Sequence, residues 1–138
     1  SVDTEVDARL TAMGPITVSD LLTWWKDGAG HSRFLALAEL PIGVAHLSAG
    51  IELYPRADTA MPEDLSVRLS ISATGSAIGD NTPVAEVSLT PRIDGDILRA
   101  DATLPIGSLA PGSYVIRATV FAGGQRLGVV TTIVSKSR

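Results

Sequence analysis

The residues of this sequence that could carry chemistry are two histidines and a few short acidic runs. Hydrolysis by a nucleophilic side chain needs a base beside the nucleophile and an acid that orients the base. His31 stands beside Ser32 in a glycine-rich stretch, and His46 lies on the outward face of an expected strand. No Gly-x-Ser-x-Gly motif occurs in the chain. We interpret both histidines as surface or capping residues and predict no catalytic site.

Two acidic runs offer oxygen atoms of the kind that calcium binds, Asp94-Gly95-Asp96 and Gly79-Asp80-Asn81. Neither has the ordered series of ligands that a calcium loop requires. Aspartate and asparagine also favour turns, and we interpret both runs as turns. The glycine pair in Ala122-Gly-Gly-Gln125 lacks the strand-to-helix context and the lysine of a phosphate-binding loop. The sequence therefore predicts neither a metal site nor a cofactor site.

Four aromatic residues are the candidate binding residues: Trp24, Trp25, Tyr54 and Phe121. We expect the two tryptophans in a loop, residues 24–30, that leaves the first strand. Adjacent residues at a strand end face opposite ways, so we expect one indole in the core and the other exposed to a sugar ring or a protein partner. Alternatively, the second indole packs beneath residues 26–32. Tyr54 and Phe121 point outward by alternation, and they either extend this patch or lie under the N-terminal segment.

Composition and charge exclude several classes of protein. The 138 residues suit one domain with one core. Hydrophobic residues make up 45% of the chain and aromatics only 4%, which favours a packed sandwich over a roomy ligand-binding barrel. The net charge of −4 is spread singly and leaves no basic stripe for nucleic acid. Because there is no cysteine, disulfides, thiolate zinc sites and cysteine nucleophiles are excluded.

The ends and apolar runs of the chain bear on its location. No apolar run approaches the ~20 residues that span a bilayer, so we expect no membrane insertion. The N-terminus lacks the basic-then-apolar order of a signal peptide. It also opens on an acidic stretch without an initiating methionine, and we therefore expect an excised piece of a longer protein. The sequence does not indicate the oligomeric state.

Period-two alternation predicts most of the strands. It is clearest at residues 65–73, where the odd-numbered residues are apolar and the even-numbered ones are polar, so we expect one core face and one wet face. Residues 33–37 are either a strand or a covering segment, and residues 93–96 are expected to form a turn. Similar patterns predict strands at residues 16–22, 44–54, 84–90, 98–104, 114–121 and 126–134.

The last two of these strands are expected to form an antiparallel hairpin. Gly123-Gly124 can adopt the positive φ angles that a tight hairpin turn requires. Before the hairpin, Pro111-Gly112-Ser113-Tyr114 is similar to the tyrosine corner of immunoglobulin-like sandwiches. We expect the Tyr114 ring to be buried and its hydroxyl to reach a backbone group across the corner.

Seven to nine strands joined by short turns predict an all-β fold, an immunoglobulin-like or fibronectin-III-like antiparallel β-sandwich, over residues 15–138. Residues 1–14 are expected to be a short helix or a linker. Val6, Leu10 and Met13 stand at helical spacing, and Gly14-Pro15 is a helix stop.

Three segments together resemble a known module: residues 13–22, Ala49-Gly-Ile-Glu-Leu-Tyr54, and residues 104–120 with their Pro-Gly-x-Tyr motif. The module is the β-sandwich at the C-terminal end of bacterial, notably acidobacterial, proteins with a von Willebrand factor A-like domain earlier in the chain. The resemblance covers residues 13–134. It implies a non-catalytic accessory module of an exported protein that is secreted, periplasmic or part of the cell envelope. Asp64-Leu-Ser66-Val-Arg68 keeps only the first two positions of the Asp-x-Ser-x-Ser adhesion motif, so no metal site is carried over.

The sequence leaves three hypotheses for the function. The first is a binding module that docks on a neighbouring domain of its own longer chain or on another protein. The second is a carbohydrate-binding module that uses Trp24 or Trp25 as a stacking platform. The third is an enzyme, which we do not favour because so few acid–base residues can converge.

Overall fold

The computed structural model describes residues 11–26, 32–34, 40, 44–56, 62–74, 85–95 and 97–136, and it assigns strands and their connections there, without a helix. The described part of the chain therefore has no helix with the length and apolarity that a membrane crossing needs. The strands are β2 (Thr11–Met13), β3 (Ile16–Val18), β4 (Leu22–Lys26), β5 (Ser32–Phe34), β6 (His46–Pro55), β7 (Leu65–Ala73), β8 (Ala85–Leu89), β9 (Arg92–Asp94), β10 (Ile97–Pro105), β11 (Gly112–Ala122) and β12 (Gln125–Lys136).

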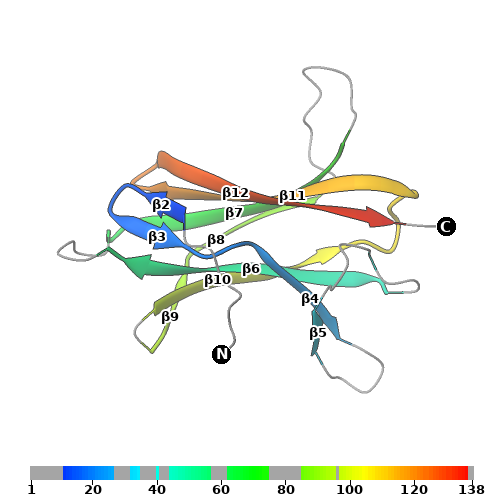
Figure 1. Cartoon of the computed structure of the whole chain (residues 1–138), viewed down its shortest axis with the longest axis horizontal. Coiled ribbons are helices and arrows are strands. Elements are labelled where there is room, and N and C mark those ends of the chain that lie inside the picture. The colour runs from blue at the N-terminus through cyan, green and yellow to red at the C-terminus, as the bar shows by residue number, and fades with distance from the viewer. Residues whose placement is uncertain are drawn as a thin grey trace.

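The strands form two antiparallel sheets that pack as a sandwich (Figure 1). One sheet has seven strands in the order β2-β3-β6-β10-β9, with β4 also paired to β6 and β5 paired to β4. The other has four strands in the order β12-β11-β7-β8. The all-β sandwich expected from the alternation is thus confirmed. The described residues form eleven strands, more than the seven to nine expected, because short strands such as β2, β5 and β9 add hairpins at the sheet edges.

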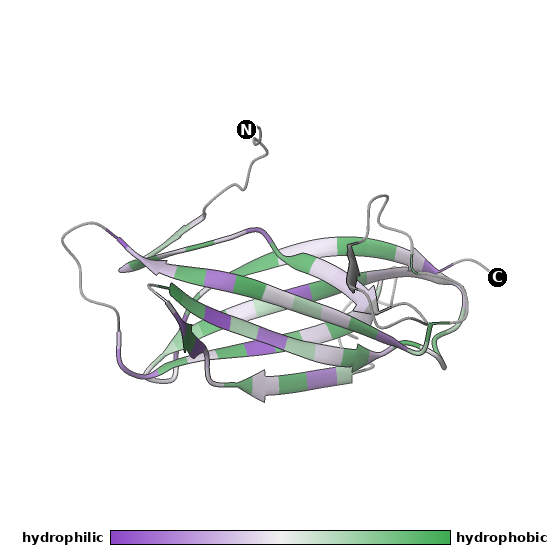
Figure 2. Ribbon diagram, turned by 90° about the horizontal axis from the view of Figure 1, so that it is seen from below, coloured by the Kyte–Doolittle hydropathy of each residue, from purple (hydrophilic) through white to green (hydrophobic). Residues whose placement is uncertain are grey.

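The core lies between the two sheets and is made of the inward faces of their long strands. Figure 2 shows hydrophobic and hydrophilic residues alternating along these strands. The hairpin of β11 and β12 closes through Gly123 and Gly124 at φ 59° and 83°, as expected. The fully buried large side chains include Leu47, Ile51 and Leu53 of β6, Val67, Leu69 and Ile71 of β7, Leu104 of β10, and Ile116 and Val120 of β11.

Tyr114 occupies the corner that the sequence predicts. Its ring is buried, with 6% exposure, and its hydroxyl donates a hydrogen bond of 2.5 Å to the carbonyl oxygen of Ala110. The bond ties the start of β11 to the chain four residues upstream, as in a tyrosine corner. The predicted role of Tyr114 is confirmed.

Four expectations about local structure are wrong. Residues 16–22 do not form one strand, because β3 ends at Val18 and β4 begins at Leu22. Residues 11–13 form β2 and not the end of a helix, and residues 1–10 lie outside the described residues. Residues 24–26 continue strand β4 and do not begin a loop, because they pair with β5. Residues 93 and 94 belong to β9, so the turn that was expected from residue 93 starts at Gly95, whose φ is 67°.

The even-numbered residues of β7 are less exposed to solvent than the alternation of apolar and polar residues predicts. Ser70 and Ser72 have only 8% and 4% exposure, although they point away from the core. Ser70 stands opposite Arg117 on β11 and opposite Glu86 on β8, so this small side chain lies between two longer ones in the middle of the sheet. Outward orientation therefore does not make these two serines tolerant of substitution.

Candidate functional site

The outer face of the seven-stranded sheet is where polar and aromatic side chains gather. Along β6, Leu47, Ala49, Ile51 and Leu53 are buried in the core, so the residues between them point outward. Directly opposed residues of an antiparallel pair share a face. The register of β4, β6 and β10 therefore decides which side chains meet on this surface.

Strand β4 brings Trp24 to this outer face. Trp24 stands opposite Ser48 and Leu22 stands opposite Gly50, so both point outward. Trp25, the next residue, packs against the core and is partly buried. The two indoles thus face opposite ways, as the alternation predicts, but from within a strand and not from a loop.

These side chains enclose a depression of about 280 Å³, which we call the Trp24 depression. It has an apolar wall on β4 and a charged wall on β6 and β10. The residues that line it are Leu22, Trp24, Gly50, Ile51, Glu52, Arg99 and Asp101.

Gly50 creates the hollow between the two walls. It stands opposite Asp101, and a Cβ atom built on Gly50 would lie 2.6 Å from the Cβ of Asp101 and 2.9 Å from the carbonyl oxygen of Ala100. A larger residue would therefore push β6 and β10 apart as well as fill the hollow. The close approach of the two strands explains why glycine occupies this position inside a strand.

Ser19 explains how β3 and β4 can share one edge of β6. The amide N–H of Ser19 donates to the carbonyl oxygen of Glu52, and the amide N–H of Glu52 donates to the Ser19 hydroxyl, both at 2.9 Å. The hydroxyl in turn donates to the carbonyl oxygen of Asp20 at 3.0 Å. A side-chain oxygen thus replaces a backbone acceptor where the edge breaks. The backbone of Glu52, at the rim of the depression, is fixed as a result.

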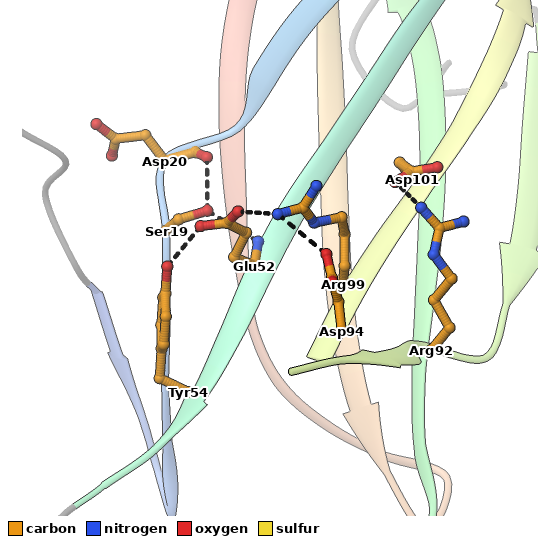
Figure 3. A network of polar contacts seen from close by, with 8 residues as sticks. All are labelled: Ser19, Asp20, Glu52, Tyr54, Arg92, Asp94, Arg99 and Asp101. Atoms are coloured by element: carbon orange, nitrogen blue, oxygen red, sulfur yellow. Dashed lines mark hydrogen bonds and ion pairs between the residues drawn. The ribbon is translucent and has the colours of Figure 1, made fainter. Parts of the chain in front are cut away.

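The Glu52 carboxylate is held from two sides, as Figure 3 shows. One oxygen accepts a hydrogen bond of 2.5 Å from the Tyr54 hydroxyl, and the other accepts one of 2.7 Å from Nη2 of Arg99. The same nitrogen of Arg99 lies 3.3 Å from the Asp94 carboxylate on β9. Charge-assisted bonds of this kind orient side chains on a surface better than neutral ones do.

Asp101 completes the charged wall. Its carboxylate accepts a hydrogen bond of 3.1 Å from Arg92, and its side chain has only 21% exposure. Nε of Arg99 is buried and has no hydrogen-bond partner. The carboxylate oxygens of the wall can each accept more than one bond, so they retain acceptor capacity toward a ligand.

The hydrogen bond to Glu52 also raises the pKa of Tyr54. Donation to a carboxylate favours the protonated phenol, and partial burial and the negative charge of Glu52 act in the same direction. Together they raise the pKa of Tyr54 to about 12. The phenol therefore acts at this site as a hydrogen-bond donor that holds Glu52.

The four candidate binding residues do not form one patch. Trp24 and Tyr54 share the outer face of the seven-stranded sheet, whereas Trp25 packs against the core. Phe121 lies on the outer face of the four-stranded sheet, where its ring centre is 5.0 Å from the guanidinium carbon of Arg68. Phe121 and Arg68 help to line a smaller hollow of about 190 Å³ there.

The sequence reasoning missed Glu52, Arg99 and Asp101. Alternation by itself places each of them only on the outward face of its strand, and pairs such as Glu52 and Arg99 are 47 positions apart. The residues described by the structure contain no group of three histidine, cysteine, aspartate or glutamate side chains that could hold a metal ion. His46 is exposed at the start of β6, while His31, residues 79–81 and Asp96 lie outside the described residues.

No family model matches this chain, and no curated protein matches it.

Proposed function

We propose that this chain is a non-catalytic binding module that attaches to its partner through the outer face of the seven-stranded sheet. The observation that carries the proposal is the Trp24 depression. An aromatic side chain, a hollow and a charged wall meet there on paired strands, and the wall is fixed by hydrogen bonds before any partner arrives. Preorganised side chains lose little entropy on binding, which favours recognition.

The topology supports placing the sandwich in the immunoglobulin-like and fibronectin-III-like class. The order β3-β6-β10-β9 opposite β12-β11-β7 corresponds to the A-B-E-D and G-F-C sheets of that class, with β8 added next to the C strand. The bond from Tyr114 to Ala110 is a further feature of such domains. Members of this class commonly serve as accessory modules, but the fold alone does not assign a function.

For the partner, we propose a neighbouring domain of the same longer chain or another protein. The resemblance to modules that follow a von Willebrand factor A-like domain supports such a domain as the partner, and it supports export from a bacterial cell. Arg92, with 66% side-chain exposure, would stand at the edge of this interface beside Asp101. Aromatic and arginine residues are the types most enriched in protein interfaces.

A second candidate function, carbohydrate binding, is supported by a specific observation. Trp24 stands at the apolar wall of a hollow whose opposite wall carries Glu52, Arg99 and Asp101. This combination of an aromatic surface and paired charged groups suits a ligand that has both an apolar face and hydroxyl groups.

The binding proposal is tested by measuring affinity for a purified bacterial von Willebrand factor A-like domain from the resembled family. We expect Arg92→Glu to weaken binding several-fold, mainly through slower association, because it reverses a charge at the edge of the interface. Arg68→Glu is the matched control, since Arg68 is also an exposed, ion-paired arginine but lies on the other sheet. Absence of binding, or an equal effect of both variants, would count against this partner and this face.

A further inference from the structure

We propose that the Trp24 depression is a subsite for one neutral pyranose ring. The inference rests on the second candidate function proposed above, carbohydrate binding, and names the class of sugar. It is drawn from the unequal walls of the depression, the hydrogen-bonding capacity of the charged wall, and the balance of charge around it.

The two walls differ in chemistry in the way that the two sides of a pyranose do. Leu22 and Trp24, neighbours on the outer face of β4, form the apolar wall. A pyranose ring has a face of C–H groups, which packs on an indole, and a rim of hydroxyl groups. The ring would lie over Gly50 with its C–H face toward Trp24 and its hydroxyls toward the opposite wall.

The charged wall offers both donors and acceptors to those hydroxyls. A hydroxyl group donates one hydrogen bond and accepts others, so it needs both kinds of partner. The Arg99 side chain lines the depression with 38% exposure and supplies guanidinium N–H donors there, although its Nε is buried. The Asp101 carboxylate accepts only the bond from Arg92 among the described contacts. Bonds from hydroxyls to such charged groups are stronger than neutral ones.

The charges around the depression favour a neutral ligand. Three carboxylates, those of Glu52, Asp94 and Asp101, are paired with the two guanidinium groups of Arg92 and Arg99, which leaves a net charge of −1. Among the side chains that the structure describes around the depression, no unpaired cation is left to balance a phosphate, sulfate or uronic acid.

The size of the depression also fits a single ring. Its volume of about 280 Å³ lies near the lower end of small-molecule pockets, which span roughly 300–1,000 Å³. A stable protein interface buries about 800 Å² on each partner, and it would have to extend well beyond these side chains. We expect weak binding of a single ring, because so small a ligand makes few contacts.

The test is a titration of the whole chain with neutral methyl pyranosides of glucose, galactose, mannose and N-acetylglucosamine, followed by saturation-transfer NMR. We expect at least one of them to bind. Trp24→Ala should weaken that binding at least about tenfold, and Asp101→Asn several-fold, as removal of stacking and of a charged partner does. Phe121→Ala, an aromatic truncation on the other sheet, should leave it unchanged. Thermal melting checks that each variant folds, and Asp101→Asn, which keeps the size of the side chain, remains informative if Trp24→Ala does not fold.

The outcomes separate this inference from the proposal of a binding module. If no pyranoside binds, or if Asp101→Asn and Trp24→Ala bind as the wild type does, the sugar subsite is wrong. If the pyranosides fail while a von Willebrand factor A-like domain binds in an Arg92-dependent manner, the binding module stands and only its ligand class is overturned. Methyl glucuronide is titrated in the same way as an anionic comparison. If it bound markedly better than methyl glucoside, the assignment of a neutral ligand would be overturned.

Discussion

Replacing Tyr114 separates the two contributions that this residue makes to stability. Tyr114→Phe removes only the hydroxyl, and with it the bond to the carbonyl oxygen of Ala110. A typical hydrogen bond contributes about 0.5 to 1.5 kcal/mol, and a stranded buried partner adds to the loss. Ala110 is exposed, so water can solvate its carbonyl group in the variant. We therefore expect a loss of about 1 kcal/mol in the free energy of unfolding.

Tyr114→Ala also removes the ring from a site with 6% exposure. Loss of a large buried side chain leaves a cavity and typically costs about 3 to 5 kcal/mol. Urea denaturation of the wild type and both variants measures the two steps. Tyr54→Phe is the control, because it removes a hydroxyl bonded to Glu52 on a half-exposed surface, and we expect a loss below about 1 kcal/mol. If Tyr114→Phe were neutral while Tyr54→Phe were costly, the corner would not anchor β11 as described.

Three further predictions concern the sheets and the site. Gly50→Ala should lower the free energy of unfolding by about 1 to 3 kcal/mol in thermal or urea melts, because the added methyl group overpacks the contact between β6 and β10; an unchanged stability would show that the strands can separate freely. Ser70→Asp should cost about 2 kcal/mol or more, because it moves a carboxylate into a site with 8% exposure beside Glu86, and Arg117 opposite offsets only part of that desolvation. Ser88→Asp, exposed and opposite Arg68, should stay within about 0.5 kcal/mol; equal stability of the two variants would contradict the burial of Ser70. The Tyr54 phenol should titrate near pH 12 by ultraviolet absorbance, and Glu52→Gln should return its pKa toward 10.0. Because the folded-state pKa is raised, the stabilisation is present below pH 10 and is lost as the pH rises through 12; a normal pKa in the wild type would refute the bond.

The long strands were predictable because each buries one face. In β6, β7 and β11 the alternation of apolar and polar residues shows directly which side chains face the core. At residues 11–13 the expected end of a helix is replaced by β2, for the opposite reason. Met13 has helical spacing to Val6 and Leu10, but its side chain lies against Gly128 of β12, so a long-range contact decides the conformation of residues 11–13.

The candidate site was only partly predictable. The opposite orientation of Trp24 and Trp25 follows from alternation, so an outward indole was expected. Which residues surround Trp24 depends on the strand register. That register places Gly50 and Asp101 opposite each other, although they are 51 positions apart in the sequence. The hollow also depends on the close approach of β6 to β10 at Gly50. That approach cannot be predicted from the composition of the chain or from the spacing of its residues.

The central claim, that the outer face of the seven-stranded sheet binds ligand at the Trp24 depression, is tested most directly by mapping with ¹H–¹⁵N NMR where the best-binding methyl pyranoside contacts the chain. We predict that the largest shifts fall on the Trp24 indole N–H and on the amides of Gly50, Arg99 and Asp101, while the indole N–H of Trp25 moves little. Shifts concentrated around Phe121 on the four-stranded sheet would contradict the claim that the outer face of the seven-stranded sheet is the binding surface.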